Sequence, residues 1–284
     1  MTDTVPPPSG LGGCREVGPG ETAAVSRALG ADRLVAAPAT EKLLQSGVGG
    51  GADGRFFTRG GPDRSLVFVG NSVLPIRGER DDLEMLGAAV AGAGFGPMSV
   101  HGRRDLVNGV WPALERRWGP ARERRCGQFL MVLDRPVDRS AVLDGVRPAS
   151  LQEFDMVLAA AASMYAEDLH ADPFAVGAGV PFRRRVARSV ARDRTFVARE
   201  DDAVFFKADV AAITHDIAQI QGIWVRPDLR GTGLGAGGTA AVCAVLQDRG
   251  LTPSLVVNGS NTPARAAYRR VGLVDAVDYA TILM

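Results

Sequence analysis

The sequence predicts an α+β fold, with helices on the faces of a mixed β-sheet. Short apolar runs, which are typical of buried strands, alternate with stretches whose apolar residues recur at helical spacing. In the second half of the chain, three consecutive strands are followed by helices and strands in alternation. This order indicates that strands and helices belong to one layered unit.

Length and composition set the scale of the protein. The chain has 284 residues, of which 46% are hydrophobic and 23% are charged, and its formal net charge is +1. This length favours two ordinary domains over one large domain. The nearly balanced charge indicates neither a nucleic acid nor a membrane as a partner of the whole protein.

The basic residues are unusual in kind. Only Lys42 and Lys207 are lysines, and all the other basic residues are arginines. A genome rich in G and C would produce this bias. The alternative is selection for phosphate binding, which the planar fork of arginine serves better than the lysine ammonium does.

The cysteines do not indicate a metal site, and the N-terminal residues do not indicate export. Cys14, Cys126 and Cys243 are odd in number and lack CxxC spacing, so neither a disulfide framework nor a zinc site is expected. The first ten residues are polar and proline-rich, unlike a signal peptide, and no apolar stretch reaches the ~18 residues of a membrane span. We therefore expect a soluble cytoplasmic protein without a metal ion. Its oligomeric state is not indicated.

The pattern predicts three parts along the chain. Residues 1–20, rich in proline and glycine, are expected to form a mobile tail. A first domain is expected over 21–140 and a second over 141–284, because the charged segment 134–140 separates two apolar-patterned halves. The clearest elements of the first half are strands over 65–69 and 128–133 and helices over 81–93 and 106–118.

The second half is more regular. Ser150 and Glu153 have the spacing of a capping box at the start of a helix. The next helix is amphipathic, with Phe182, Val186 and Val190 on one face and arginines on the other. The remaining predicted elements are strands over 145–148, 195–199, 203–210 and 217–225, a helix over 233–248, a strand over 254–257, a helix over 263–271, and a last strand ending at Met284.

A glycine-rich turn after the strand over 217–225 is the clearest candidate site. Its glycines let several backbone N–H groups point at one place near the positive end of a helix dipole, which predicts an anion site. Gly233, Gly235 and Gly238 satisfy the G-x-G-x-x-G spacing of dinucleotide-binding folds. However, only 46 residues follow Gly238, and no acidic residue ends the next strand, so this alternative fails. A Walker loop fails too, because the chain contains no Gly-Lys-Ser or Gly-Lys-Thr sequence.

The turn resembles the cofactor loop of the GNAT superfamily of N-acetyltransferases. In that motif an Arg or Gln, two residues, a Gly, one residue, and then Gly or Ala surround the pyrophosphate of CoA. Arg230, Gly233 and Gly235 occupy those places. Glycines let the backbone touch phosphate oxygens, and a guanidinium adds a charge-assisted hydrogen bond. The resemblance implies that the residues which bind the cofactor are Ile223, Trp224, Val225, Arg230, Gly231, Thr232, Gly233, Leu234 and Gly235.

A second segment, one helix and one strand later, resembles GNAT motif B. Asn261 begins a helix, Tyr268 lies seven residues on, and Gly272-Leu273 closes the helix where Gly-Phe is usual. The two motifs in this order and at this distance imply the GNAT fold, a mixed and mostly antiparallel sheet flanked by helices. The resemblance adds Asn258 and Asn261 to the cofactor-binding residues.

Segments outside these motifs resemble an actinobacterial-type family of tandem GNAT proteins. They cover 118–123, 205–208 and 219–225. In that family a degenerate GNAT-like domain precedes the catalytic one, which implies a smaller GNAT-like α/β domain at the start of this chain. The first half has no R-x-x-G-x-G loop, so we expect it to bind no CoA.

The resemblance also implies a mechanism, in which a primary amine attacks the thioester of acetyl-CoA or another acyl-CoA directly. The strand ending at 223–225 would separate from its neighbour and offer backbone groups to the thioester. Tyr268 would be the catalytic residue, because its hydroxyl would donate to the departing thiolate. Family members often use a glutamate on the strand before the loop as general base, but this strand offers only Gln219 and Gln221. The remaining candidates for the base are a water relay and the side chains of Glu167, Asp168, His170, Asp172, His215 and Asp216.

The acceptor is expected to be a small-molecule or peptide amine that the sequence does not specify. Two stretches are rich in arginine: 103–125 has seven arginines against three acids, and 183–194 has six against one. They are either solvated helix faces or surfaces for a phosphate-bearing or acidic partner. GNAT-like tandem proteins include enzymes that take an aminoacyl group from tRNA, which makes aminoacyl-tRNA an alternative donor. A non-catalytic CoA-binding regulator is a further alternative, since no general base is evident.

Overall fold

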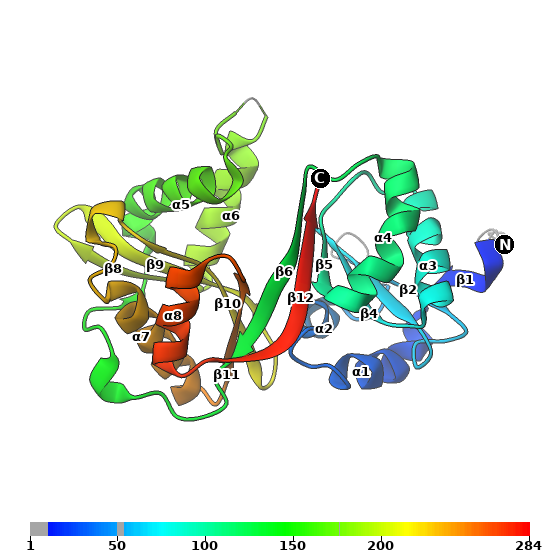
Figure 1. The fold of residues 1–284 in the computed structure, drawn as a ribbon, viewed down its shortest axis with the longest axis horizontal. Coiled ribbons are helices and arrows are strands. Elements are labelled where there is room, and N and C mark those ends of the chain that lie inside the picture. The colour runs from blue at the N-terminus through cyan, green and yellow to red at the C-terminus, as the bar shows by residue number, and fades with distance from the viewer. Residues whose placement is uncertain (1–10, 50–53, 176) are drawn as a thin grey trace, which may run out of the picture. The chain divides into compact units, whose positions relative to one another are not determined.

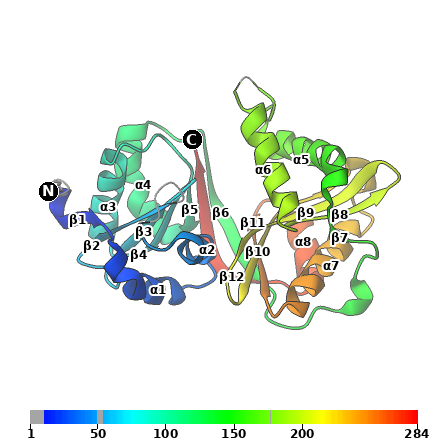
Figure 2. The ribbon, with the colours of Figure 1, turned by 180° about the vertical axis from the view of Figure 1, so that it is seen from behind.

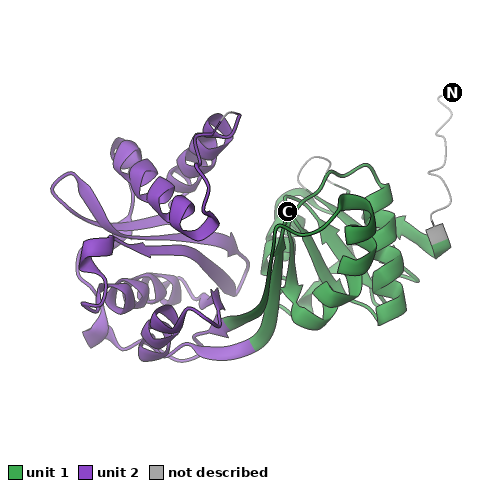
Figure 3. Ribbon diagram, turned by 45° about the horizontal axis from the view of Figure 1, so that its top comes forward, with its two compact units in different colours: residues 1–130, 277–284 green, residues 131–276 purple. Residues whose placement is uncertain are grey.

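The computed structural model describes residues 11–49, 54–175 and 177–284 (Figure 1). The chain forms two compact units: unit 1 comprises Met1–Leu130 with Val277–Met284, and unit 2 comprises Met131–Ala276 (Figure 3). Across the described residues, no helix combines the length and the apolar composition that crossing a membrane requires.

Unit 1 contains a mixed sheet with the strand order β1-β2-β3-β4-β5-β12-β6. Its first four strands are antiparallel neighbours, β5 is parallel to β4, and β12 is antiparallel to β5. The elements of the unit are β1 (Cys14–Glu16), α1 (Thr22–Gly30), α2 (Ala37–Ser46), β2 (Arg55–Arg59), β3 (Leu66–Val69), β4 (Val73–Arg77), α3 (Arg80–Gly92), β5 (Val100–Arg103), α4 (Arg104–Trp118), β6 (Glu123–Val132) and β12 (Val274–Leu283).

Helices α3 and α4 enclose the core of unit 1. Leu86 and Val90 of α3, and Val110 and Leu114 of α4, are completely buried. Their four-residue spacing puts both residues of each pair on one helix face. Gly87 lets the two helices approach closely, because a Cβ there would lie 2.5 Å from the carbonyl oxygen of Val110.

Unit 2 has the strand order β11-β10-β9-β8-β7, with α7 and α8 on one face of the sheet (Figure 1) and α5 and α6 on the other (Figure 2). Side chains of β9 alternate between these faces. Phe206 packs under α7, where a Cβ on Gly238 would come within 2.3 Å of its ring. The elements are β7 (Arg147–Pro148), α5 (Phe154–Leu169), α6 (Gly179–Ala191), β8 (Thr195–Glu200), β9 (Ala203–Ile213), β10 (Ile217–Val225), α7 (Leu234–Asp248), β11 (Thr252–Asn258) and α8 (Thr262–Val271).

Strand β10 is irregular where it approaches the glycine-rich turn. It pairs in parallel with β11 only over 217–220, opposite 252–255, although both strands continue beyond these residues. Its antiparallel register with β9 shifts by one residue between Gln221 and Trp224. This is a β-bulge, in which Gly222 adopts a φ of +58°. The strand therefore leaves β11 and bulges shortly before its end.

The local predictions for the second half agree with the structure. The capping box forms, with the Ser150 N–H donating to Glu153 Oε2 at 2.9 Å. Phe182, Val186 and Val190 are the buried residues of α6. Both features depend on residues within one or two helical turns of each other, so the sequence pattern is sufficient to predict them.

Part of the N-terminal tail that is predicted over residues 1–20 forms a strand in the structure. Residues 1–10 lie outside the described residues. Cys14–Glu16 form β1, which pairs with β2 across Cys14–Arg59 and Glu16–Phe57. Burial of the Cys14 side chain in the core of unit 1 fixes this short strand, although the sequence around it is glycine-rich.

The compact units also differ from the predicted domains. Unit 1 ends at Leu130 rather than at residue 140, and it includes Val277–Met284. The reason is that residues 279–282 of β12 pair with β5, a contact between segments far apart in the chain. A compact unit need not coincide with a domain, so the domain limits 21–140 and 141–284 stay a prediction.

Candidate functional site

The glycine-rich turn after β10 adopts a backbone conformation that its glycines make accessible. A single 3-10 turn, Pro227–Leu229, follows the strand, and α7 begins at Leu234. Gly231 and Gly233 have φ values of +80° and +95°, in a region that residues with a Cβ rarely adopt. The Thr232 hydroxyl donates to the carbonyl of Leu229 at 2.7 Å and holds the turn from within.

The start of α7 presents backbone N–H groups. Gly233 is the N-cap residue, and its carbonyl accepts from the Gly237 N–H at 3.0 Å. The N–H groups of residues 234–236 precede this bond and have no carbonyl partner within the helix. Together with the helix dipole they favour an anion. Gly238, the last glycine of the G-x-G-x-x-G spacing, has a packing role against Phe206 instead.

Arg230 is held between the end of β10 and α5. Its Nε donates to the carbonyl of Val225 at 3.0 Å, and its Nη2 donates to Glu167 Oε2 at 2.6 Å. The other carboxylate oxygen of Glu167 accepts from the Trp224 indole at 3.2 Å. Nearly half of the Arg230 side chain is exposed, so the guanidinium keeps N–H groups available to a ligand beside the loop.

The predicted residues of the second motif lie on helix α8 and at its two ends. The side chain of Asn261 caps the helix by accepting from the Ala264 N–H at 3.2 Å, and the backbone carbonyl of Asn258 accepts from the Asn261 N–H at 3.0 Å. Burial raises the pKa of Tyr268 to about 12, so the phenol is protonated at neutral pH. Gly272, with a φ of +109°, ends the helix as the motif predicts.

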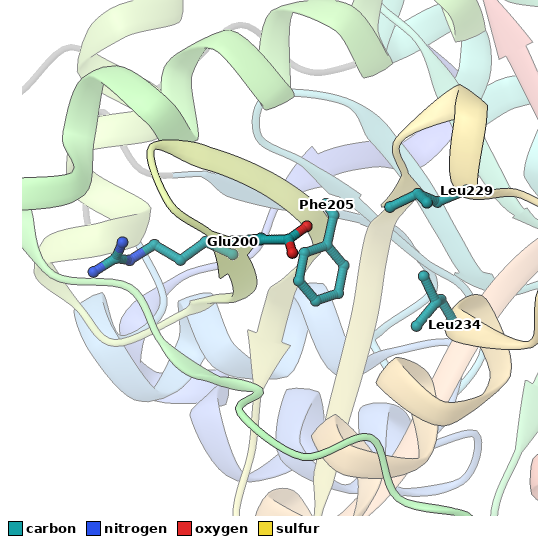
Figure 4. Close-up of a pocket in the computed structure, with 5 residues that line it drawn as sticks. Glu200, Phe205, Leu229 and Leu234 are labelled. Carbon is teal, nitrogen blue, oxygen red and sulfur yellow. The ribbon is translucent and has the colours of Figure 1, made fainter.

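A pocket of about 380 Å³ adjoins the loop (Figure 4). Leu229 and Leu234, which flank the loop glycines, contribute to it together with Phe205 of β9. Arg199 and Glu200 of β8 complete its lining. The start of α7 therefore lies beside a surface that is partly apolar and partly charged.

The predicted candidates for a general base are dispersed. Gln219 is buried and Gln221 is exposed, and neither has an acidic side chain. His215 and Asp216 precede the first residue of β10, whereas the loop follows its last residue. Glu167 is near the loop, but both of its carboxylate oxygens are engaged by Arg230 and Trp224.

Asp209 is a carboxylate at this site that the sequence interpretation did not select. Its Cα lies opposite that of Gln221 across the β9–β10 pair, at the edge of the bulge. Lys207 Nζ donates to Asp209 Oδ2 at 2.5 Å, and Thr195 Oγ1 donates to Oδ1 at 2.7 Å. The two-residue spacing of Lys207 and Asp209 within a predicted strand puts both on one face, and this was the available signal.

The two arginine-rich stretches use their charges differently. Five arginines of 103–125 form ion pairs with carboxylates: Arg103, Arg104, Arg116, Arg124 and Arg125. The exposed arginines of α6 and of its C-cap position form no ion pair with any carboxylate that the structure describes: Arg183, Arg184, Arg185 and Arg188 within the helix, and Arg192 after it. The first stretch is thus largely neutralised by the chain itself, whereas α6 presents unpaired positive charge.

Both units repeat one succession of elements. Unit 1 contains β4, α3, β5 and α4 in this order, and unit 2 contains β10, α7, β11 and α8. In each succession the two strands are parallel. The glycine-rich turn occurs only in the second succession, because Gly78 and Glu79 alone connect β4 to α3.

Two family models match parts of the chain. A domain of unknown function (DUF4081) matches residues 54–157, and FR47-like protein matches residues 207–280. The second match contains β10, the loop and Tyr268. No curated protein sequence matches the chain.

Solved structures resemble the chain over nearly its whole length. An acetyltransferase of the GNAT family from Colwellia psychrerythraea has a TM-score of 0.55 at 10% identity, covering 95% of this chain and 98% of that one. A GCN5-related N-acetyltransferase from Sphaerobacter thermophilus has a TM-score of 0.59 at 17% identity, covering 95% and 94%. A Drosophila protein has a TM-score of 0.63 at 13% identity, covering 96% and 98%. These likenesses show that the chain has a GNAT-like fold over nearly its whole length, and the FR47-like match covers the region with the loop and Tyr268.

Proposed function

We propose that this protein is an N-acyltransferase that moves an acyl group, most simply acetyl, from acyl-CoA to a primary amine. The observation that carries the proposal is the loop from Arg230 to Gly235. Gly231 and Gly233, both at positive φ, direct the backbone of the loop towards the start of α7. The half-exposed guanidinium of Arg230 lies beside these glycines. The pyrophosphate of CoA has the charge and the acceptor oxygens that such a site favours.

The end of β10 offers a backbone edge to which the pantetheine arm of the donor could bind. Beyond Ile220 the strand is no longer paired with β11, so the backbone of 223–225 has an edge without a strand partner on that side. An extended pantetheine arm could hydrogen-bond to this edge as an added strand does. A backbone N–H close to the bulge would then donate a hydrogen bond to the thioester oxygen and stabilise its developing negative charge.

In the proposed reaction the amine attacks the thioester carbon directly, a C–N bond forms, and CoA leaves as its thiolate. Tyr268 would donate a proton to the sulfur. With a pKa of about 12, the group is present in its protonated form throughout the neutral range.

Among the residues that the structure describes in unit 1, no segment offers a comparable place for CoA. The connection of β4 to α3 is short, and the first turn of α3 contains Asp81 and Asp82 after the N-cap residue Glu79. Asp82 is buried and paired with Arg59 and Arg64, but the exposed carboxylates of Glu79 and Asp81 would repel a phosphate from this helix N-terminus. We therefore propose one donor site for each chain, in unit 2.

Aminoacyl-tRNA is the second candidate donor, and the unpaired arginines of α6 favour it. The ion pairs within 103–125 count against it, because a tRNA contact would need many free cations. A regulator that binds acyl-CoA without turnover is the third candidate.

Calorimetric titration of acetyl-, succinyl- and malonyl-CoA into the protein tests the proposal. We expect at least one acyl-CoA to bind, with only a weak dependence on salt and without competition from RNA. A tRNA donor would instead bind with a log–log salt slope close to the number of phosphates contacted, and Arg184→Glu, Arg185→Glu and Arg188→Glu together would abolish that binding. Tight, salt-sensitive tRNA binding together with ribonuclease-sensitive activity would contradict acyl-CoA as the donor.

A further inference from the structure

We infer that Asp209 is the general base that receives the proton of the attacking amine, and that Lys207 and Thr195 hold it in position. The inference rests on the proposed acyl transfer. It supplies the catalytic group for which the strand before the loop has no acidic side chain.

The position of Asp209 relative to β10 is the first argument. Its Cα pairs with that of Gln221, the last residue before the bulge. A Cβ on Gly222 would lie 3.2 Å from Asp209 Oδ2, so the carboxylate lies directly against the backbone of the bulge. The bulge lies within the end of β10 that is not paired with β11, which begins after Ile220. A thioester bound along that edge would therefore lie across β10 from this carboxylate, where Gly222 has no side chain to separate them.

The hydrogen bonds of Asp209 fix the side chain without saturating it. Lys207 Nζ donates to one oxygen at 2.5 Å and Thr195 Oγ1 donates to the other at 2.7 Å. Thr195 Oγ1 also lies 2.9 Å from the hydroxyl oxygen of Ser189 on α6. A carboxylate can accept about four hydrogen bonds. Because 18% of the Asp209 side chain is exposed, an amine N–H can reach the acceptor positions that remain.

The presence of a lysine rather than an arginine at position 207 also supports the inference. It is one of only two lysines among 33 basic residues, and its side chain is 1% exposed. A guanidinium in this buried position would bring five N–H donors where the lysine ammonium brings three, and unmet buried donors are costly. A compact cation therefore fits here where an arginine does not. Its fixed charge also disfavours the protonated form of an amine that binds beside it.

In the proposed step the amine loses one proton and the departing sulfur gains one. The lone pair of the neutral amine forms a bond to the thioester carbon, and the C–S bond breaks with its electron pair on sulfur. The proton lost by the nitrogen passes to Asp209, while Tyr268 gives its proton to the thiolate. Asp209 then releases its proton to solvent and Tyr268 regains one, so the products are an amide and CoA thiol.

Glu167 is the competing carboxylate, and its contacts assign it a different role. One oxygen accepts from Arg230 and the other from Trp224, so it is committed to holding the loop and the strand end. Asp209, in contrast, lies on the strand opposite the bulge itself.

The test compares Asp209→Asn, the double variant Lys207→Met/Asp209→Asn and the control Asp193→Asn, in which an exposed aspartate of the same unit changes in the same way. In the single variant the buried ammonium of Lys207 loses its carboxylate partner. The double variant avoids this because it removes the ammonium as well. CoA release from acetyl-CoA is measured with glycinamide, spermidine and a lysine-containing peptide as probe amines. Acetyl-CoA affinity is measured in parallel by calorimetry.

We expect both Asp209 variants to bind acetyl-CoA as the wild type does and to turn over about 100-fold more slowly at neutral pH. Their deficit should shrink as the pH rises towards the pKa of the probe amine, since solvent then removes the proton. Wild-type rates in the double variant, or a deficit equal at every pH, would overturn the role of Asp209. Failure of the wild type to bind acetyl-CoA, or to transfer to any probe amine, would instead contradict the proposed function.

Discussion

Tyr268→Phe is expected to lower turnover by about 10- to 1000-fold while leaving the affinity for acyl-CoA unchanged. The substitution removes only the hydroxyl and keeps the ring. Because burial raises the pKa of this phenol to about 12, the wild-type group is a proton donor at every pH from acid to well above neutral. The rate of CoA release at saturating donor measures the effect.

The matched control is Tyr165→Phe. Tyr165 belongs to the same unit and packs its ring edge-on against Phe182, with centroids 5.4 Å apart. It should tolerate loss of its hydroxyl with no effect on turnover. Equal rates for Tyr268→Phe and the wild type would make Tyr268 a packing residue, and CoA would leave as an unassisted thiolate.

Gly233→Val should weaken acyl-CoA binding by at least about 100-fold, or ~2.7 kcal/mol. Gly233 has a φ of +95°, which a β-branched residue resists, and its position at the start of α7 lets phosphate oxygens approach the backbone. A valine would both distort the turn and place methyl groups where the pyrophosphate is proposed to lie. Calorimetric titration with acetyl-CoA gives the difference in affinity.

Gly250→Val separates these two causes. Gly250 follows the other end of α7, has a φ of +76°, and, like Gly233, has open space where a Cβ would be. Both substitutions therefore carry a similar backbone strain, and only the change at Gly233 should affect the donor. Equal affinities for the two variants would argue against a cofactor at the loop.

The sequence predicted those features that depend on neighbouring residues. The burial of one face of α6 follows from the spacing of Phe182, Val186 and Val190. The conformation of the loop follows from glycines at 231 and 233, which occupy backbone regions closed to most residues. Such signals are local, so a single sequence contains them in full.

Features that depend on long-range pairing could not be predicted in this way. Strand β12 pairs with β5, which lies more than half the chain away. The sequence leaves open whether the arginines of 103–125 form a solvated helix face or a surface for an acidic partner, and it does not show that Arg116 pairs with Glu84 and Arg104 with Asp278. Asp209 became a candidate only when the register of β9 placed it against the bulge.

A structure determined with acetyl-CoA bound is the most direct measurement of the proposed donor site. We predict that the pyrophosphate oxygens lie about 3 Å from backbone nitrogens within 231–236. The pantetheine arm should follow the unpaired end of β10, with the sulfur next to the Tyr268 hydroxyl. At saturating acetyl-CoA, an empty loop or a pyrophosphate bound elsewhere on the protein would contradict the proposal.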